Sequence, residues 1–261
     1  MAKIYVAGLG PGSVENMTAQ AIKAIEDSDY IIGYSTYIDL IRDLVQSLYD
    51  KQNCLHKDCS LKDKIIVSSP MKKEKERCIE ALQMASQGYN VCVVSSGDCG
   101  IYGMAGIMLE LASKTKENID IEIIPGITAA SAAAAILGAP INHDFAAISL
   151  SDLLTPWDKI ALRLECAAKA DFVICLYNPK SVKRVKHIEM AKDIIMKYRD
   201  AKTPVGIVKN AYRDGQTHVI SCLKDMLEYE IDMFTILIIG NSETYVQNGR
   251  MITPRGYEVG R

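Results

Sequence analysis

The sequence has no apolar run that approaches the roughly 18 residues a membrane-spanning helix requires. It also lacks a leader in which basic residues precede an apolar stretch, because the first residues already follow a strand pattern. We therefore expect a cytoplasmic protein with no membrane association. The net charge of −2 lacks the positive excess of a general nucleic-acid binder, so nucleic acid is not an expected partner.

Eight cysteines in 261 residues do not make a disulfide scaffold. Cys92 and Cys175 lie in apolar, strand-like runs, where cysteine usually behaves as a small hydrophobic residue. Cys54, His56 and Cys59 form a short cluster, but no second Cys/His pair follows at the spacing of a zinc site. We expect reduced thiols and no resident metal.

Two familiar phosphate-binding motifs are incomplete in the opening stretch YVAGLGPGSVENMT, residues 5–18. The dinucleotide-binding pattern G-x-G-x-x-G lacks its third glycine, which falls on Ser13, and Pro11 removes one backbone N–H from the loop. A P-loop would need Gly-Lys-Ser/Thr after the glycines, and none is present. The glycines still allow the backbone to approach a ligand closely. A tight strand-to-helix turn without a ligand is the alternative for this loop alone.

Strand-like and helix-like segments alternate along the chain, which predicts an α/β fold with a largely parallel sheet in the first half. The expected strands are residues 3–7, 30–34, 64–67, 90–95, 121–124, 172–177, 203–208 and 235–240. The expected helices are residues 18–27, 37–49, 72–86, 103–113 and 181–198, with a further helix from Thr128. Residues 142–159 are expected to form another strand and a loop. Asp214-Gly215 is a hairpin signal, so the second half should mix parallel and antiparallel pairing. We place the domain boundary at residue 130, which gives domains 1–130 and 131–261.

Three glycine-containing turns follow strands of the first half: Gly8–Gly12, Ser95–Gly103 and Pro125–Ala129. In an open α/β sheet, ligands bind beyond the carboxyl ends of the strands. We therefore expect the three turns to converge on one binding site.

These turns, written G-x-G-P-G, G-D-x-x-x-Y-G and P-G-I-T-A, resemble the marks of the tetrapyrrole methyltransferases. The likeness continues through Tyr177-Asn178-Pro179 and residues 232–235, and so covers nearly the whole chain. The resemblance implies a two-domain α/β fold (class III), with a mainly parallel N-terminal sheet and a mixed C-terminal sheet. It also implies S-adenosylmethionine as cofactor, S-adenosylhomocysteine as its product, a tetrapyrrole substrate and a homodimer.

Five stretches narrow the resemblance: GYSTYIDLI, SSGDCGIYGMAG, GAPINHDFAAISLSDLLTPW, LYNPKS and TPRGY. They are similar to the group that methylates carbon C17 of a corrin precursor, precorrin-3B or cobalt-factor III, with ring contraction in cobalamin biosynthesis. Methylation of another tetrapyrrole position or another acceptor remains an alternative, as does a non-catalytic module that binds an adenosyl ligand. Macrocycles with and without cobalt both remain open as substrates.

The resemblance also implies which residues bind the cofactor. They are Gly10, Pro11, Gly97, Asp98, Ile101, Tyr102, Thr128, Ala129, Tyr177, Asn178, Ala211 and Thr235. The Asp98 carboxylate is a pure acceptor, suited to ribose hydroxyls or an ammonium group. Thr128 could instead cap its helix. Cys99 stands where a smaller residue such as alanine is common in the family, and we expect little consequence.

Ring contraction requires proton transfers, which a positioned side chain can supply. The candidates for this general acid/base work are His143, Asp144, Ser149, Ser151 and Asp152. As alternatives, His143 could cap a strand end and Asp152 could cap the following helix. Phe145 and Trp157 in the same segment could lie against a flat macrocycle.

A tetrapyrrole carries many acetate and propionate groups, so its site should contain several cations. The candidates are Lys180, Lys183, Arg184, Lys209, Arg213 and Arg255. Arginine suits carboxylates through its bidentate fork. A solvated helix face is the alternative for the lysines.

Overall fold

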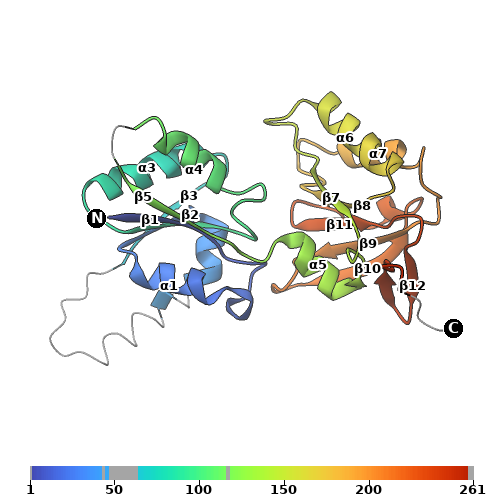
Figure 1. Ribbon diagram of the computed structural model, residues 1–261, viewed down its shortest axis with the longest axis horizontal. Coiled ribbons are helices and arrows are strands. Elements are labelled where there is room, and N and C mark those ends of the chain that lie inside the picture. Colours follow the sequence, from blue (N-terminus) through green and yellow to red (C-terminus); the bar gives the residue numbers. More distant parts are fainter. Residues whose placement is uncertain (1, 43–44, 47–63, 116–117, 258–261) are drawn as a thin grey trace. The chain divides into compact units, whose positions relative to one another are not determined.

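The computed structural model describes residues 2–42, 45–46, 64–115 and 118–257. The chain divides into two compact units, Met1–Thr128 and Ala129–Arg261, each containing a five-stranded sheet (Figure 1). The division lies close to residue 130, where the sequence analysis places it. The cluster of Cys54, His56 and Cys59 falls outside the described residues.

The first unit is built on a parallel sheet with the strand order β3-β2-β4-β1-β5. Its strands are β1 (Lys3–Gly8), β2 (Tyr30–Tyr34), β3 (Ile65–Ser69), β4 (Val91–Ser95) and β5 (Asp120–Ile124). Parallel neighbours need crossover connections, and helical segments supply several of them. These are α1 (Ala19–Asp27), the helical residues 35–42, α3 (Glu74–Ser86) and α4 (Ala105–Ala112). The mainly parallel N-terminal sheet predicted from the sequence is confirmed.

Helices cover both faces of this sheet, and the alternation of the strands decides which side chains meet which helix. Ile4 and Val6 of β1 belong to a buried cluster with Met108 of α4. Ala7 belongs to the opposite cluster, with Ile25 of α1. Figure 1 shows α3 and α4 on one side of the sheet and α1 on the other. Burial on both faces explains why these strands read as continuous apolar runs.

The second unit contains a mixed sheet with the order β10-β9-β11-β8-β7. Its strands are β7 (Phe145–Ser149), β8 (Val173–Tyr177), β9 (Pro204–Lys209), β10 (Thr217–Cys222) and β11 (Thr235–Ile239). Only β7 and β8 pair in parallel, and the other neighbours are antiparallel. β9 and β10 form a hairpin around Asp214-Gly215, as predicted. The expected mixed C-terminal sheet is therefore confirmed.

Three helices bury the two faces of the mixed sheet. α6 (Trp157–Lys169) and α7 (His187–Ile195) pack together on one face, while α5 (Ala129–Leu137) contributes to a separate cluster on the other. A small sheet of β6 (Gly138–Ala139), β13 (Arg250–Ile252) and β12 (Tyr245–Gln247) completes the unit. Strands of two or three residues carry no periodic signal, so the sequence analysis misses this sheet.

The helix predicted over residues 181–198 is wrong at its start, because α7 begins only at His187. Residues 181–184 instead form a closed loop in which Ser181 N donates to Arg184 O and Arg184 N donates to Ser181 O, each at 3.1 Å. The Arg184 side chain fixes this loop through carbonyl oxygens of Leu150 and Asn178. A tertiary contact therefore overrides the local helical pattern.

The buried cysteines behave as the small hydrophobic residues that the sequence predicts. Burial raises the pKa of Cys92 and of Cys175 to about 12. Six cysteines of the described part of the chain are free thiols.

The carboxyl ends of β1, β4 and β5 meet where the backbones of Gly8, Gly97 and Gly126 touch, and we call these three residues the glycine junction. A Cβ atom added to Gly8 would lie 2.7 Å from both Gly126 N and Gly97 O. A Cβ atom on Gly126 would collide with Gly97 O and with the Gly8 carbonyl group. No side chain larger than hydrogen fits at Gly8 or Gly126, so three turns approach one another at backbone distance.

We predict that Gly8→Ala lowers the free energy of unfolding by about 1–3 kcal/mol or more, because an extra methyl group is forced into a packed site. Gly106→Ala is the matched control, since nothing lies within 4 Å of an added Cβ in that helix. It should raise stability by up to ~1 kcal/mol, because alanine is the better helix former. Urea unfolding of both variants measures the two effects, and equal midpoints for Gly8→Ala and wild type would contradict the steric argument.

Candidate functional site

The first turn is held against the second by a two-way backbone bridge. Gly10 N donates to Gly97 O at 3.1 Å, and Gly97 N donates to Gly10 O at 2.8 Å. Gly10 has φ +71°, and a Cβ atom there would lie 2.6 Å from Asn16 O. Pro11 follows and is buried. The predicted cofactor residues Gly10, Pro11 and Gly97 are therefore brought together.

Asp98 joins the second turn to the third. Its Oδ1 accepts a hydrogen bond from Gly100 N at 2.8 Å, and its Oδ2 accepts one from Gly126 N at 3.0 Å. A carboxylate oxygen has more than one lone pair, so both oxygens keep the capacity to accept from a ligand. The carboxylate is thus a structural link whose free acceptor positions lie at the glycine junction.

Cys99 is bound more closely into the junction than the sequence analysis expects. Its Sγ lies 3.2 Å from Val6 O and 3.2 Å from Ile124 O, and the side chain is buried. Burial and the neighbouring Asp98 charge raise the pKa of the Cys99 thiol. The neutral thiol lies between the carboxyl-terminal ends of β1 and β5 and can donate a hydrogen bond to the carbonyl group of Val6 or of Ile124.

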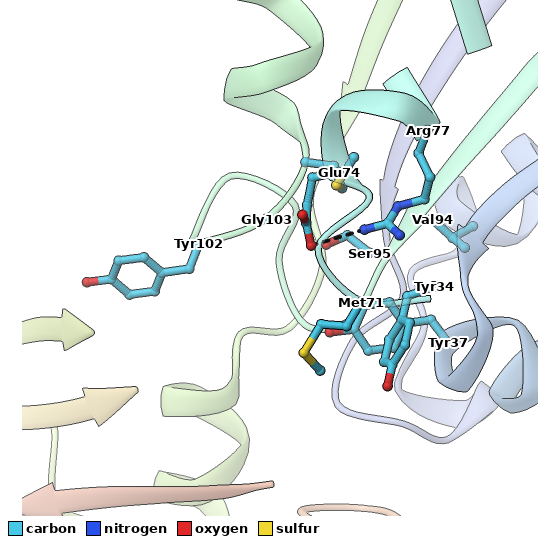
Figure 2. Close-up of a pocket in the computed structure, with 10 residues that line it drawn as sticks. Tyr34, Tyr37, Met71, Glu74, Arg77, Val94, Ser95, Tyr102 and Gly103 are labelled. Carbon is cyan, nitrogen blue, oxygen red and sulfur yellow. Dashed lines mark ion pairs between the residues drawn. The ribbon is translucent and has the colours of Figure 1, made fainter. Parts of the chain in front are cut away.

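Ile101 and Tyr102 continue the second turn with exposed side chains. Tyr102 has φ +56°, a backbone conformation that non-glycine residues rarely adopt. In Figure 2 its ring points away from the other residues around it. Strained backbone of this kind is concentrated at ligand-binding sites. Thr128 and Ala129, the last predicted pair of the third turn, fall on either side of the division between the units.

A pocket of about 100 Å³ opens beside the second turn, at the carboxyl ends of β2 and β4 (Figure 2). Its polar end is Arg77, which donates to Ser69 Oγ at 3.0 Å and Pro70 O at 3.1 Å and pairs with Glu74 at 3.3 Å. Its other lining residues are Tyr34, Tyr37, Met71, Val94, Ser95, Tyr102, Gly103 and Met104. The sequence analysis does not predict this pocket, although the stretch GYSTYIDLI contains both of its β2-side tyrosines.

In the second unit, parallel pairing of β7 and β8 sets Ser149 opposite Tyr177. Ser149 Oγ accepts hydrogen bonds from Asn178 Nδ2 at 2.9 Å and from Ser151 N at 3.2 Å. Asn178 has φ +48°, and the Tyr177 hydroxyl accepts from Ala130 N at 3.0 Å. Predicted cofactor and acid/base residues therefore lie side by side at these two strand ends.

Asp152 lies just beyond this turn and contacts a histidine that the sequence analysis does not identify. Its Oδ2 lies 2.9 Å from His187 Nε2, and its Oδ1 lies 4.0 Å from Arg184 Nε. Trp157 contacts the His187 ring edge-on, with ring centroids 4.6 Å apart. Asp152 does not cap α6, whose N-cap is Pro156 and has no side-chain cap. Since His187 is 35 residues away in the sequence, only the tertiary fold brings this pair together.

His143 and Asp144 are not brought to the same place. They precede β7, whereas Ser149 ends it and Asp152 follows it. A five-residue strand separates its ends by roughly 16 Å. His143 Nδ1 accepts from Asp144 N at 2.8 Å, and both side chains are exposed. The predicted acid/base residues are therefore divided between the two ends of one strand.

The predicted cations have different environments. Arg184 is buried, and its Nη1 donates to Leu150 O at 3.0 Å and Asn178 O at 2.6 Å. Lys209 pairs with Asp232 at 2.9 Å and Glu230 at 2.8 Å, and these hydrogen bonds raise its pKa. Lys183 and Arg255 are exposed, while Lys180 and Arg213 are half-buried.

The remaining two predicted cofactor residues lie near the paired ends of β9 and β11. Thr235 is buried at the start of β11, and its hydroxyl donates to Asp232 Oδ1 at 2.9 Å. Ala211 lies in the β9–β10 turn, which also contains Arg213. The Lys209–Asp232–Thr235 contacts connect that turn to the start of β11.

Across residues 2–42, 45–46, 64–115 and 118–257, no group of three His, Cys, Asp or Glu residues is placed to hold a metal ion. Within the same ranges, no helix has the length and apolar character needed to cross a bilayer.

Several methyltransferases are similar to this chain over almost its whole length, among them one from Priestia megaterium and one from Salmonella typhimurium. The cobalt-factor III methyltransferase of Priestia megaterium is 46% identical over 260 residues, which cover 98% of this chain and 45% of that protein. The probable cobalt-factor III C(17)-methyltransferase of Salmonella typhimurium is 46% identical over 256 residues, which cover 98% of this chain and 100% of that protein. The chain thus spans about half of the first relative and all of the second.

The fold is also similar to that of a known methyltransferase. The crystal structure of the methyltransferase CobJ superimposes with a TM-score of 0.84 at 30% identity, covering 97% of this chain and 100% of that one. Residues 3–227 match the sequence profile of the tetrapyrrole (corrin/porphyrin) methylases. With the glycine junction, the Asp98 link and the mixed second sheet in place, the chain belongs to the tetrapyrrole methylase family of methyltransferases.

Proposed function

We propose that this protein transfers a methyl group from S-adenosylmethionine to carbon C17 of a corrin precursor, with contraction of the macrocycle, in cobalamin biosynthesis. The observation that carries the proposal is the glycine junction with its Asp98 link, in a chain 46% identical to the Salmonella C(17)-methyltransferase. Both relatives are named for cobalt-factor III. The proposed substrate is therefore the cobalt-bearing macrocycle.

The glycine junction suits the cofactor. Gly97 carries no side chain, so a ligand can approach its peptide group closely, and two backbone hydrogen bonds join it to Gly10. Asp98 retains acceptor positions for ribose hydroxyls or for the ammonium group. When bound, S-adenosylmethionine supplies a methyl group that its sulfonium centre has already activated. The other proposed contacts are Pro11, Ile101, Tyr102, Thr128, Ala129, Tyr177, Asn178, Ala211 and Thr235.

The protein's own task in methyl transfer is alignment. The conjugated macrocycle provides an electron-rich carbon, so the chain does not need a nucleophilic side chain. Holding the reacting groups in line supplies much of the rate through effective concentration. The short backbone contacts of the junction give the rigidity that such alignment requires.

Ring contraction also needs a group that moves protons, and we propose Asp152 for this work. Its carboxylate is 40% exposed, so one part is available to a ligand while His187 contacts the other. Ser149 is close by in sequence and shares a hydrogen bond with Asn178. His143 and Asp144, at the other end of β7, have no comparable cluster among the described residues.

The carboxylate groups of the substrate require cations, and we propose Lys180, Lys183, Arg213 and Arg255 as candidates. Arg184 donates to two carbonyl groups from a buried position, so we assign it to support of the Asn178 turn. Lys209 is neutralised by its two acidic partners and is the weaker candidate.

We also propose that the protein is cytoplasmic and that it forms a homodimer, the second of which the family resemblance implies. Light scattering at micromolar concentration should give the mass of two chains. A mass of one chain would contradict the homodimer.

We predict that Asp98→Ala weakens the binding of S-adenosylhomocysteine. Loss of a charged hydrogen-bond partner costs roughly 1.5–3 kcal/mol, which is about 10- to 150-fold in Kd. Glu110→Ala is the matched control, because it removes the same charge from an exposed position on α4. Calorimetric titration measures both affinities, and an unchanged Kd for a folded Asp98→Ala protein would remove Asp98 from the site.

We predict that the wild-type protein transfers labelled methyl groups to the cobalt-bearing macrocycle faster than to the cobalt-free one. Asp152→Ala should lower product formation by the ~10²-fold or more that follows loss of a proton-transfer group. His143→Ala should have the smaller effect, since it lies beyond the other end of β7. Both variants should bind S-adenosylmethionine within about twofold of wild type, as neither residue is a proposed cofactor contact. Wild-type rates for Asp152→Ala would refute its proposed role, and no methyl transfer by the wild-type protein would refute the function.

A further inference from the structure

We infer that His187 is a positioning residue for Asp152: it fixes one carboxylate oxygen and leaves the other part of the group to the substrate. This inference rests on the proposed role of Asp152 in proton transfer. It is carried by a cluster of four side chains, Asp152, Trp157, Arg184 and His187, which come from two loops and the starts of two helices.

The first observation is the burial of His187. Its side chain is 16% exposed, and its Nδ1 is a buried atom with no hydrogen-bond partner in the described part of the chain. A hydrogen on Nδ1 would therefore be a buried donor without an acceptor, which costs roughly 1–3 kcal/mol. The favoured tautomer has its hydrogen on Nε2. That hydrogen is donated to Asp152 Oδ2 across 2.9 Å.

The second observation is the fixed orientation of the imidazole ring. Trp157 lies edge-on to it at 4.6 Å between centroids, an arrangement that aromatic pairs prefer. Trp157 is the first residue of α6 and His187 is the first residue of α7, two helices that pack together. The ring is thus held by the helix pair with its Nε2 toward Asp152.

The third observation is a guanidinium group near the same carboxylate. Arg184 Nε lies 4.0 Å from Asp152 Oδ1, opposite the oxygen that His187 contacts. Its own position is fixed by Leu150 O and Asn178 O, and its side chain is 10% exposed. Asp152 itself remains 40% exposed. One group is therefore held by two buried partners while its outer part faces solvent.

A carboxylate that is held by two buried partners while its outer part stays exposed is an arrangement typical of functional groups. A buried ring nitrogen without a partner is destabilising, and replacement by an apolar side chain would remove that cost. The unpartnered nitrogen is His187 Nδ1, and the other ring nitrogen, Nε2, contacts Asp152, the residue that we propose to move protons. Orientation by a second side chain is a recurring means of holding an acid/base group in its productive geometry.

Three variants of the full-length protein test the inference: His187→Leu, His187→Gln and the control His218→Gln. His187→Leu keeps the apolar packing and removes the donor, so kcat should fall by about 10- to 100-fold, less than or equal to the loss of Asp152 itself. The KM for S-adenosylmethionine should stay the same. His187→Gln retains an N–H group at similar reach and should recover most of the activity. His218 is exposed on β10, and its replacement should change nothing.

Trp157, the one tryptophan of the sequence, gives a readout independent of activity. Imidazole quenches the emission of a neighbouring indole, so the emission intensity of Trp157 reports how the two rings lie against each other. The intensity should change in His187→Leu, where the imidazole is gone, and in Asp152→Asn, where the hydrogen bond that orients the imidazole is altered. It should not change in His218→Gln.

The outcomes separate the inference from the function on which it rests. If Asp152→Asn turns over at the wild-type rate, the proton-transfer role of Asp152 and its positioning by His187 are both overturned. If Asp152→Asn is slow but His187→Leu is as fast as wild type, only the inference is overturned. An equal loss of activity in His187→Leu and His187→Gln, with lowered urea midpoints in both, would assign His187 to folding and also overturn the inference. Slow turnover in His187→Leu, recovery in His187→Gln and altered Trp157 emission support it.

Discussion

The structure depends on the absence of side chains at the glycine junction. The backbones of Gly8, Gly97 and Gly126 occupy space that a single Cβ atom would fill, and this contact sets the distance between the ends of β1, β4 and β5. The hydrogen bond from Gly126 N to Asp98 Oδ2 is possible only at that distance, because it joins a residue after β5 to one after β4. The proposed cofactor site follows from this packing constraint.

Each unit uses one charged side chain to hold its turns in place, a carboxylate in the first unit and a guanidinium in the second. In the first, the Asp98 carboxylate accepts from backbone N–H groups of two turns. In the second, the Arg184 guanidinium donates to backbone carbonyl groups of two segments, at Leu150 and Asn178. Each charged group satisfies peptide groups that lie outside regular strands, where they would otherwise lack partners. A charged residue near a site can therefore support the backbone instead of binding a ligand, which is the role we propose for Arg184.

Much of the fold could be predicted because its signals are local. Apolar runs such as Val91–Ser95 and Thr235–Ile239 predict buried strands, and Asp214-Gly215 predicts the β9–β10 hairpin. The start of α7 could not, because residues 181–186 follow a helical pattern that the Arg184 contacts override. The Asp152–His187 pair could not either, since no local pattern connects residues 35 positions apart. The sequence motifs located the glycine turns, while the pairing of side chains required the tertiary structure.

The glycine junction also has an evolutionary consequence. Its geometry is set by main-chain atoms, so substitutions in the surrounding side chains leave the peptide groups of the three turns in place. The side chains that line the Arg77 pocket, among them Tyr34, Tyr37 and Met71, take no part in that backbone contact. In a duplicated gene of this architecture, side-chain substitutions can therefore change the surroundings of the turns, while three small residues keep the backbone geometry on which the proposed cofactor site depends.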